Sequence, residues 1–310
     1  MAQALASTII EAPVEAVWAA VRDFGALAAW HPGIARSVVE QGHDPDVVGC
    51  IRELTLHDGG IARERLVMLD DSRYRFTYNF ETPPFPVANY LSTLELIPVT
   101  NGDATYARWS ATFDEKPEDT GRYVDVVSNG IFAPGLAGLA SRLRETTVSA
   151  PGLRWQGHRP AKVFCSSVIP ASLERVWQEM RNFAGMGGWH PEIRDMCMLG
   201  DVRADKVSGV RDFRFGTGRL REQLTLLSDL DHEFRYKINA SDTAWLNYHA
   251  GVRLYPITTS GESLAVWTAD WTASAVDDVT LIPMVHGEVF QLAFDTLSQT
   301  LVAQGVARRL

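Results

Sequence analysis

The sequence predicts an α+β protein made of two copies of one domain, each a curved antiparallel sheet packed against a long C-terminal helix. Three observations lead to this fold class. A long segment of the chain repeats itself, short stretches with alternating apolar residues follow one another in each copy, and each copy ends in an apolar stripe with helical spacing.

The repeat is visible in the aromatic residues. The segment STIIEAPVEAVW…RDFGALAAWHPGI recurs as SSVIPASLERVW…RNFAGMGGWHPEI, so that Trp18 matches Trp177. Further matches continue at a nearly constant spacing to the end of each copy. We therefore expect one domain at 1–148, a linker containing Pro and Gly at 149–162, and a second domain at 163–310. The two copies are expected to pack as an intramolecular pseudo-dimer.

The elements of the first copy follow in order. Residues 6–10 are typical of a strand, and Pro13 fits a helix start, where its missing N–H costs nothing. Val14, Val17, Trp18 and Val21 then form one helical stripe, and a short helical piece leads into the Trp-His-Pro turn. Five alternating segments predict strands at 52–56, 63–69, 74–80, 89–96 and 106–113.

The last helix of each copy is predicted from its apolar face. In the first copy this face is Ser128, Phe132, Leu136, Leu139 and Leu143. In the second copy it is His286, Phe290, Phe294, Leu297 and Leu301.

Composition excludes several classes of protein. Of 310 residues, 46% are hydrophobic and 22% charged, which is typical of a globular chain rather than a disordered one. The net charge of −9 argues against a nucleic-acid partner. No signal-like or membrane-spanning segment is present, and three scattered cysteines fit a reducing compartment, so we expect a cytoplasmic protein. No metal-ligand spacing or cofactor motif occurs, and we expect neither.

Several motifs carry a resemblance to a known superfamily. They are APxEAVW, RDFxxxxxWHP, VGxxREL, RERLxxLDD and ANYxSTLEL, with weaker forms in the second copy (ASLERVW, WHPEI, SGVRDF, REQL, LNY). The chain resembles a tandem START/SRPBCC protein, a superfamily that includes polyketide cyclase/dehydrase-like proteins and plant abscisic-acid receptors. The resemblance implies a helix-grip fold with a large apolar cavity between sheet and helix, gated by loops. Residues 82–90 fall where the family has a mobile loop, although a rigid turn is the default interpretation.

Strand alternation places charged residues on apolar faces. Glu64 shares a face with Leu66 and Met68, and Glu222 shares one with Leu224 and Leu226. Arg52 and Arg211 also fall on apolar faces. Because an isolated buried charge is very costly, we expect the pairs Arg52–Glu64 and Arg211–Glu222. Each pair could bind ligand or be purely structural.

The Trp-His-Pro histidines complete each candidate site. His31 and His190 stand where the abscisic-acid receptors carry a basic residue of the cavity, so the resemblance implies a place in the cavity. Histidine suits proton transfer better than carboxylate binding. The alternative is a turn histidine that hydrogen-bonds the backbone.

Inward aromatic residues are further candidates for ligand contacts, although most aromatics of this kind belong to the core. Tyrosine hydroxyls at inward positions need partners. The candidates are Tyr78, Tyr90, Trp109 and Phe113 in the first copy, and Tyr236, Tyr248, Trp267, Trp271 and His286 in the second.

The functional expectation rests on these groups and on the resemblance. We expect a cofactor-independent cyclase, dehydratase or lyase that acts on a hydrophobic, carbonyl-containing small molecule, polyketide-like or aromatic. His31, Glu64, His190 and Glu222 would supply general acid/base catalysis. The alternative is a non-catalytic carrier or sensor of a hydrophobic small molecule. A further possibility is that one copy is active while the other supports it.

Overall fold

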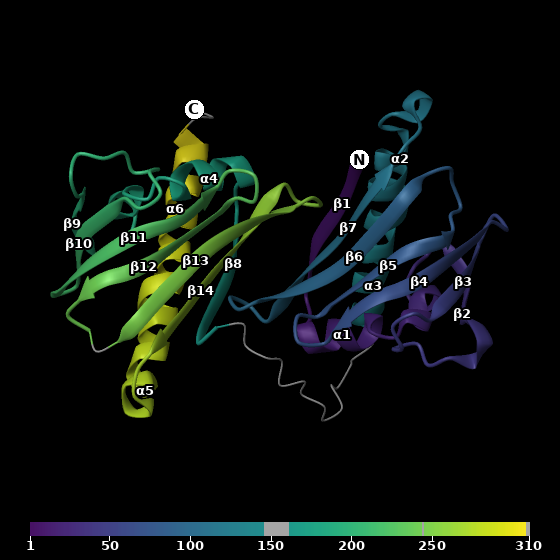
Figure 1. The fold of residues 1–310 in the computed structure, drawn as a ribbon, viewed down its shortest axis with the longest axis horizontal. Helices are drawn as coiled ribbons and strands as arrows, with labels where there is room; N and C mark the ends of the chain where they lie inside the picture. Colours follow the sequence, from purple (N-terminus) through teal and green to yellow (C-terminus); the bar gives the residue numbers. More distant parts are fainter. Residues whose placement is uncertain (146–160, 244, 308–310) are drawn as a thin grey trace. The chain divides into compact units, whose positions relative to one another are not determined.

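The computed structural model describes residues 1–145, 161–243 and 245–307. The chain forms two compact units, each with a seven-stranded antiparallel sheet and a long C-terminal helix (Figure 1). The predicted α+β architecture is therefore confirmed in both copies. Most of the predicted linker at 149–162 lies outside the described residues. Each unit is considered by itself below.

The first sheet places the strands in the order β1-β7-β6-β5-β4-β3-β2, so the first strand pairs with the last. All the strands predicted from the sequence are present. Strand β2 was not predicted, because its alternation is short and mostly polar. The strands are β1 (Ala2–Ile10), β2 (Ile34–Val39), β3 (Ile51–Leu56), β4 (Ile61–Asp70), β5 (Arg75–Thr82), β6 (Ala88–Val99) and β7 (Ala104–Asp114).

The helices of the first unit include α1 (Val14–Val21), which Pro13 precedes as its N-cap residue. The 3₁₀ turn η1 (Phe24–Ala29) leads into the Trp-His-Pro turn. The C-terminal helical path runs without a break through α2 (Arg122–Asp125), the π-helical turn η4 (Val126–Phe132) and α3 (Ala133–Glu145), and packs on β1. Short 3₁₀ turns η2 (Glu40–Gly42) and η3 (Pro117–Asp119) lie in connections.

The second unit repeats this order as β8-β14-β13-β12-β11-β10-β9. Its strands are β8 (Val163–Ile169), β9 (Ile193–Met198), β10 (Val210–Phe215), β11 (Gly218–Ser228), β12 (Glu233–Ser241), β13 (Leu246–Ile257) and β14 (Glu262–Thr272). Its helices are α4 (Leu173–Met180), the 3₁₀ turn η5 (Gly185–Gly188), α5 (Ala275–Met284), the π-helical turn η6 (Val285–Gln291) and α6 (Leu292–Ala307).

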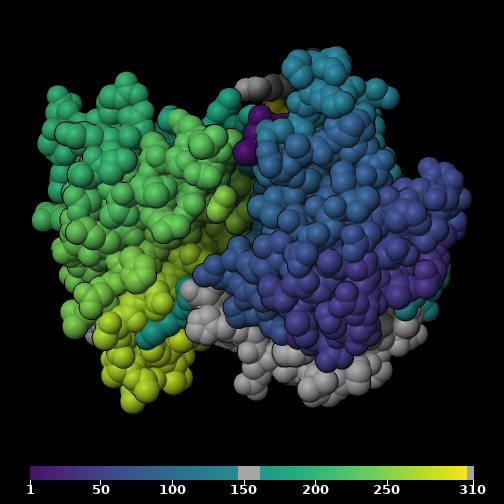
Figure 2. Space-filling view, turned by 45° about the vertical axis from the view of Figure 1, so that its right-hand side comes forward, coloured from purple at the N-terminus to yellow at the C-terminus, as the bar shows by residue number. Residues whose placement is uncertain are grey.

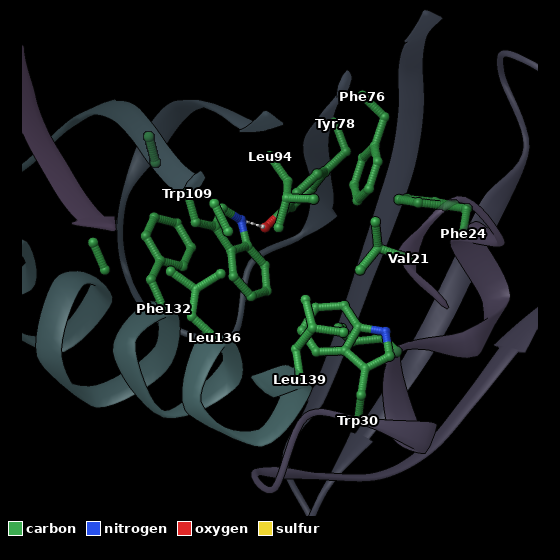
Figure 3. Close-up of a cluster of buried hydrophobic side chains, with 14 of the residues drawn as sticks. Val21, Phe24, Trp30, Phe76, Tyr78, Leu94, Trp109, Phe132, Leu136 and Leu139 are labelled. Atoms are coloured by element: carbon green, nitrogen blue, oxygen red, sulfur yellow. Dashed lines mark hydrogen bonds between the residues drawn. The ribbon is translucent and has the colours of Figure 1, made fainter. Parts of the chain in front are cut away.

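The core of each unit lies between the sheet and the C-terminal helix. In the first unit Trp109 stacks on Phe132 with ring centroids 4.7 Å apart (Figure 3), and its Nε1 donates to the Tyr78 hydroxyl at 3.1 Å. In the second unit Trp267 stacks on Phe290 at 4.4 Å. A tryptophan ring thus joins sheet to helix at the same place in each copy. Its burial is strongly stabilising because an aromatic ring buries a large apolar surface.

The π-helical turns change the buried face of the last helix. The sequence predicted that this face begins at Ser128 and His286, four residues before Phe132 and Phe290. Apart from the half-buried Leu143, the rest of the predicted face is buried, and so is Ser128, whereas His286 is only half-buried. The apolar residues that begin the face are Val127 and Val285, five residues before the phenylalanines, and the sequence did not predict them. A π-turn bonds i to i+5 and carries one more residue than an α-turn. Ser128 instead accepts a hydrogen bond from Leu5 N.

A β-bulge also shifts the predicted alternation of β4 and β11. The register slips between Leu66 and Met68, and between Leu224 and Leu226. Leu69 and Leu227 therefore pack against the cores. The predicted inward positions of Met68 and Leu226 are wrong, because a bulge moves every later side chain by one position.

A repeated clip fastens the first helix of each copy. In the first unit Asp71 accepts hydrogen bonds from Trp18 Nε1 (2.8 Å) and from Arg22 Nε and Nη2 (2.7 and 2.9 Å). In the second unit Trp177 and Arg181 bond Asp229 in the same way. The repeated Trp and Arg of the sequence thus have a structural role outside the cavity.

The outer face of each sheet carries charged side chains. Arg63 on β4 pairs with Glu40, and Arg219 and Arg221 on β11 pair with Asp212. Figure 2 shows a continuous surface of side chains over the strands of each sheet, blue for the first unit and green for the second. None of the helices in the described ranges is both long and apolar enough to cross a membrane.

Candidate functional site

Each unit contains the predicted buried Arg–Glu pair on two neighbouring strands. In the second unit Arg211 on β10 lies directly opposite Glu222 on β11. Arg211 Nε donates to Glu222 Oε2 at 2.7 Å, and Nη2 lies 2.5 Å from the same oxygen. Nη1 donates to the carbonyl of Phe183. The pairing that the sequence predicted is confirmed. The carboxylate of Glu222 and the carbonyl of Phe183 together hold the three nitrogens of the guanidinium.

The same geometry recurs in the first unit. Arg52 Nε donates to Glu64 Oε2 at 2.7 Å, Nη2 lies 2.6 Å from that oxygen, and Nη1 donates to the carbonyl of Phe24. The guanidinium carbon lies 3.9 Å from the centroid of the Phe24 ring, and this cation–π contact adds to the fixation.

The arrangement leaves one carboxylate oxygen without a donor. Nε and Nη2 of Arg211 both approach Oε2, and no described residue donates to Oε1 of Glu222. Only 6% of the Glu222 side chain is exposed. Burial raises the pKa of Glu222, and the positive charge of Arg211 opposes this rise. A carboxyl group with a raised pKa and a free oxygen can accept a proton from a bound molecule.

A cavity of about 300 Å³ in the second unit gives Glu222 an enclosed space. This volume is at the lower end of the range for small-molecule sites. Its wall is largely apolar, and Glu222, Tyr236 and Tyr248 are its buried polar residues. The apolar part of the wall comes from both the sheet and the helical elements: Met186, Ile193, Phe213, Phe215, Leu220, Met284, Val285 and Val289.

Exposed or half-buried residues mark the open end of the cavity. Thr217 comes from the β10–β11 turn and Arg219 from the start of β11, and Asp242 and the half-buried Thr243 come from the β12–β13 connection. Asp242 holds the two segments together by accepting a hydrogen bond from Arg219 N at 2.9 Å. The second segment corresponds in the repeat to 82–90 of the first copy, where the resemblance implies a loop over the cavity.

Two tyrosine hydroxyls form a directed chain beside Glu222. Trp267 Nε1 donates to the Tyr236 hydroxyl at 3.2 Å, and the hydroxyls of Tyr236 and Tyr248 hydrogen-bond one another. Because an indole N–H can only donate, one lone pair of the Tyr236 oxygen is occupied, and the two hydroxyls keep their protons for each other and for a ligand. Burial, followed by the charge of Glu222, raises the pKa of Tyr236, so it stays protonated.

The histidines lie at the contact between turn and helix. His31 Nδ1 accepts from Gly33 N at 3.0 Å, and Nε2 lies 3.0 Å from the Ile131 carbonyl, to which it donates. His190 bonds Glu192 N and the Val289 carbonyl in the same way, at 3.2 Å each. Burial lowers the pKa of both, so each ring is neutral with both nitrogens occupied. This geometry matches the turn-histidine alternative and removes the support for their predicted catalytic role.

The remaining predicted residues divide between wall and core. Tyr236 and Tyr248 line the cavity, whereas Arg211 stands behind Glu222. Trp267 and Trp271 are buried but outside the lining, as is the half-buried His286. In the first unit Tyr78, Tyr90, Trp109 and Phe113 are all buried in one aromatic core.

Sequence reasoning missed part of the wall. Trp245 lines the cavity, stacks near Tyr248 with ring centroids 4.8 Å apart, and has a buried Nε1 without a partner among the described residues. The available signal was its segment, SDTAWLNY, because it differs from TPPFPVANY, the matched segment of the first copy. Within the described parts of the chain, no cluster of His, Cys, Asp or Glu could hold a metal ion.

A curved antiparallel sheet that grips one long helix defines the helix-grip class, and this chain carries that unit twice. Residues 1–144 and 160–302 match the family described as polyketide cyclase/dehydrase and lipid transport. Because the match covers most of the chain, the protein belongs to this family.

Individual relatives cover parts of the chain. Abscisic acid receptor PYL7 of Arabidopsis thaliana is 35% identical over 92 residues, which are 29% of this chain and 42% of the receptor, so the chain spans less than half the length of this curated relative. The structure of XoxI from Bacillus cereus is 30% identical, with a TM-score of 0.43, and covers 47% of this chain and 97% of its own. The di-domain ARO/CYC BexL from the BE-7585A biosynthetic pathway is 12% identical, with a TM-score of 0.41, over 96% of this chain and 98% of its own.

Proposed function

We propose that the second unit is a cofactor-independent enzyme that abstracts a proton next to the carbonyl group of a hydrophobic small molecule, as a cyclase, dehydratase or lyase does. The observation that carries the proposal is the unpaired Oε1 of Glu222 in the wall of an apolar cavity. The chain's membership of the polyketide cyclase/dehydrase and lipid transport family supports this class of reaction.

The proposed step uses two groups on one wall. Glu222 Oε1 takes the proton from the carbon beside the carbonyl, and the C–H electron pair moves into the enolate. The Tyr248 hydroxyl donates a hydrogen bond to the enolate oxygen as its negative charge develops. Arg211 holds the carboxylate in place, and its positive charge opposes the rise that burial causes in the pKa of Glu222. A general base of this kind typically contributes about 10²–10⁴ in rate.

The charges of the cavity limit the substrate. Glu222 is inside and Asp242 is at the open end, whereas Arg211 and Arg219 are already paired with Glu222 and Asp212. A ligand carboxylate would meet like charge at both places, so we expect a neutral molecule with a carbonyl group and a mostly apolar body.

The second candidate is a carrier of the same kind of molecule. It is favoured by one observation, that both ring nitrogens of His190 are bonded to the backbone, so a second acid/base group is missing beside Glu222. A carrier would bind the molecule and leave its protons unchanged. The pseudo-dimer, the absence of a nucleic-acid partner and the cytoplasmic location stay predictions.

Proton exchange tests the proposal without knowledge of the natural substrate. The probe is 2-tetralone in deuterium oxide, and the measured quantity is the rate at which deuterium replaces the protons beside its carbonyl. We expect the protein to accelerate this exchange, and Glu222→Gln to lose the acceleration by about 10²-fold or more. Glu64→Gln, at the matched position of the first unit, is the control and should retain it.

Two results would count against the enzyme. Exchange that Glu222→Gln leaves unchanged would remove Glu222 from the reaction. Binding of 2-tetralone with no exchange above the buffer rate would establish the carrier instead. Native mass spectrometry of the purified protein, followed by extraction of any bound molecule, would then identify its cargo.

A further inference from the structure

The two copies differ at the residues around the site. Glu64 matches Glu222 and Tyr90 matches Tyr248, and these matches define the register of the comparison. In that register Phe85 stands where the second copy has Thr243. Thr243 lines the cavity at its open end.

Aromatic rings fill this region in the first unit. Phe85 stacks on Tyr123 with ring centroids 5.3 Å apart, and Phe80 stacks on Tyr90 at 4.0 Å. Phe85 also meets Tyr90 edge to face. The second copy has Ile238, Thr243 and Leu281 at the positions of Phe80, Phe85 and Tyr123. Each of these replacements removes a ring, whereas Trp245 stands where the first copy has Val87. Fewer rings thus lie between sheet and helix at these three positions, which leaves more open space there.

The hydroxyl groups are also satisfied differently. In the first unit the buried Ser92 accepts from Trp109 Nε1 at 3.1 Å and donates to the Ser110 carbonyl. It also interacts with the hydroxyls of Tyr78 and Tyr90. The second copy has Ala250 at this position. Tyr248 therefore has Tyr236 as a hydroxyl partner but lacks the serine that also lies beside Tyr90. A buried hydroxyl with fewer protein partners has capacity left for a hydrogen bond to a polar ligand.

The helix lies closer to the turn in the first unit. A Cβ atom on Gly135 of α3 would lie 2.5 Å from His31 Cδ2 and 2.8 Å from Trp109 Cζ3. The second copy has Ala293 at this position, and its methyl group is fully buried. Helix α6 must therefore leave room for a methyl group where α3 leaves none, which also favours a wider interior in the second unit.

From these three differences we infer that only the second copy takes up ligand, and that the first copy is held closed by Phe80, Phe85 and Tyr123 and has its hydroxyls satisfied by Ser92. Thr243 and Ala250 are the residues that open the second site and keep Tyr248 available. The inference rests on the proposed function, because it assigns the bound neutral carbonyl compound to one of two repeated domains. The first copy then serves as a folded support.

Exchange of these residues between the copies tests the inference. The probe is prodan, an uncharged naphthyl ketone whose emission shifts to the blue in apolar surroundings, titrated to give its stoichiometry and Kd. We expect one prodan per chain. Thr243→Phe with Ala250→Ser should weaken binding by about tenfold or more, equivalent to ~1.4 kcal/mol. Phe85→Thr with Ser92→Ala should open the first copy and raise the stoichiometry to two.

The matched control is Leu246→Phe, which adds a ring beside the same connection at a residue that is 69% exposed, and should leave binding unchanged. Far-UV circular dichroism verifies the fold of each variant. Two prodan molecules per wild-type chain, or a site lost only through the first-copy substitutions, would overturn the inference. No prodan binding by the wild type would overturn both the inference and the proposed site for a neutral ketone. One prodan per chain without any proton exchange would leave the inference standing and overturn only the proposed enzyme.

Discussion

His31 donates from Nε2 to the backbone carbonyl of Ile131 at 3.0 Å and so joins the Trp-His-Pro turn to the π-helical turn of the C-terminal helix. His190 and Val289 repeat this contact in the second unit. The histidine thus has a structural role, because it fastens the helix to a turn from which strands β2 to β7 separate it in the chain. In the second unit both partners adjoin the cavity wall.

Replacement of His190 by alanine should lower stability. The Val289 carbonyl and Glu192 N would both lose a partner, at a cost of about 1–3 kcal/mol for a buried group left unsatisfied. Urea denaturation of the second unit measures this loss. Prodan binding should weaken with it, while the pH profile of proton exchange should keep its shape. A profile that loses a limb in His190→Ala would restore the histidine to the chemistry.

The lowered pKa of His31 and His190 has a defined effect on stability. Burial makes each folded-state pKa lower than the ordinary value of 6.5, so the unfolded chain binds protons more readily. Stability should therefore fall as the pH drops from 6.5 through the lowered pKa. Titration of the histidine Cε1 protons by NMR measures both values, and a pKa above 6.5 for either histidine would contradict the neutral, doubly bonded ring.

The Arg211–Glu222 pair should show strong coupling between its members. Glu222→Leu leaves a buried guanidinium without its partner, and we expect a loss of about 3–5 kcal/mol. Arg211→Met combined with Glu222→Leu replaces both charges with apolar groups and should recover most of that loss. A double-mutant cycle in urea measures the coupling, with Arg52→Met and Glu64→Leu as the matched cycle. Equal losses in the single and double variants would show that the pair is not coupled.

Asp71 should contribute stability that acid removes. Hydrogen bonds from Arg22, together with that from Trp18, hold the pKa of Asp71 below its usual 3.8. The contribution is complete above 3.8 and is lost as the pH falls through the lowered pKa. Asp71→Asn should cost about 1 kcal/mol at pH 7, since solvent screens this half-exposed pair, and should flatten the acid limb. An unchanged acid limb would contradict this role.

Two glycines of the first C-terminal helix should respond in opposite ways to alanine. A Cβ on Gly135 would lie 2.5 Å from His31, whereas a Cβ on Gly130 would meet nothing within 4 Å. Gly135→Ala should destabilise the first unit by about 1–3 kcal/mol through overpacking. Gly130→Ala should stabilise it by about 0.5–1 kcal/mol through helix propensity. Thermal denaturation measures both, and equal shifts would show that the helix can move away freely.

The sequence predicted the ion pairs because they depend on the two-residue period of strands. Arg52 and Glu64 alternate with polar neighbours on strands that meet, and no other inward residue could neutralise either charge. The residues beyond Leu66 could not be placed in this way, because a bulge leaves no mark in the hydrophobic pattern. The π-turn could not be predicted for a related reason, since the spacing of Ser128 and that of Val127 from Phe132 are both compatible with a helical face.

The position of the histidines could not be derived from the sequence. His31 bonds the backbone groups Gly33 N and Ile131 C=O. Because every residue type carries the same backbone groups, the sequence does not reveal which of them a histidine binds. The cavity is a similar case, because it depends on small volumes that differ between the copies. Thr243 in place of Phe85 was visible in the sequence, but its consequence depends on which rings Phe85 contacts.

The pairing of β1 with β7 has a consequence for the chain as it is being synthesised. Ala2 lies opposite Phe113, so the first strand of the domain has to wait for the last one before it gains a partner. A nascent chain that stops before β7 has the edge of β1 exposed and cannot close its sheet. Each copy is thus completed only when its final strand and helix have left the ribosome, and until then the unpaired edge of β1 can pair with the strands of other chains.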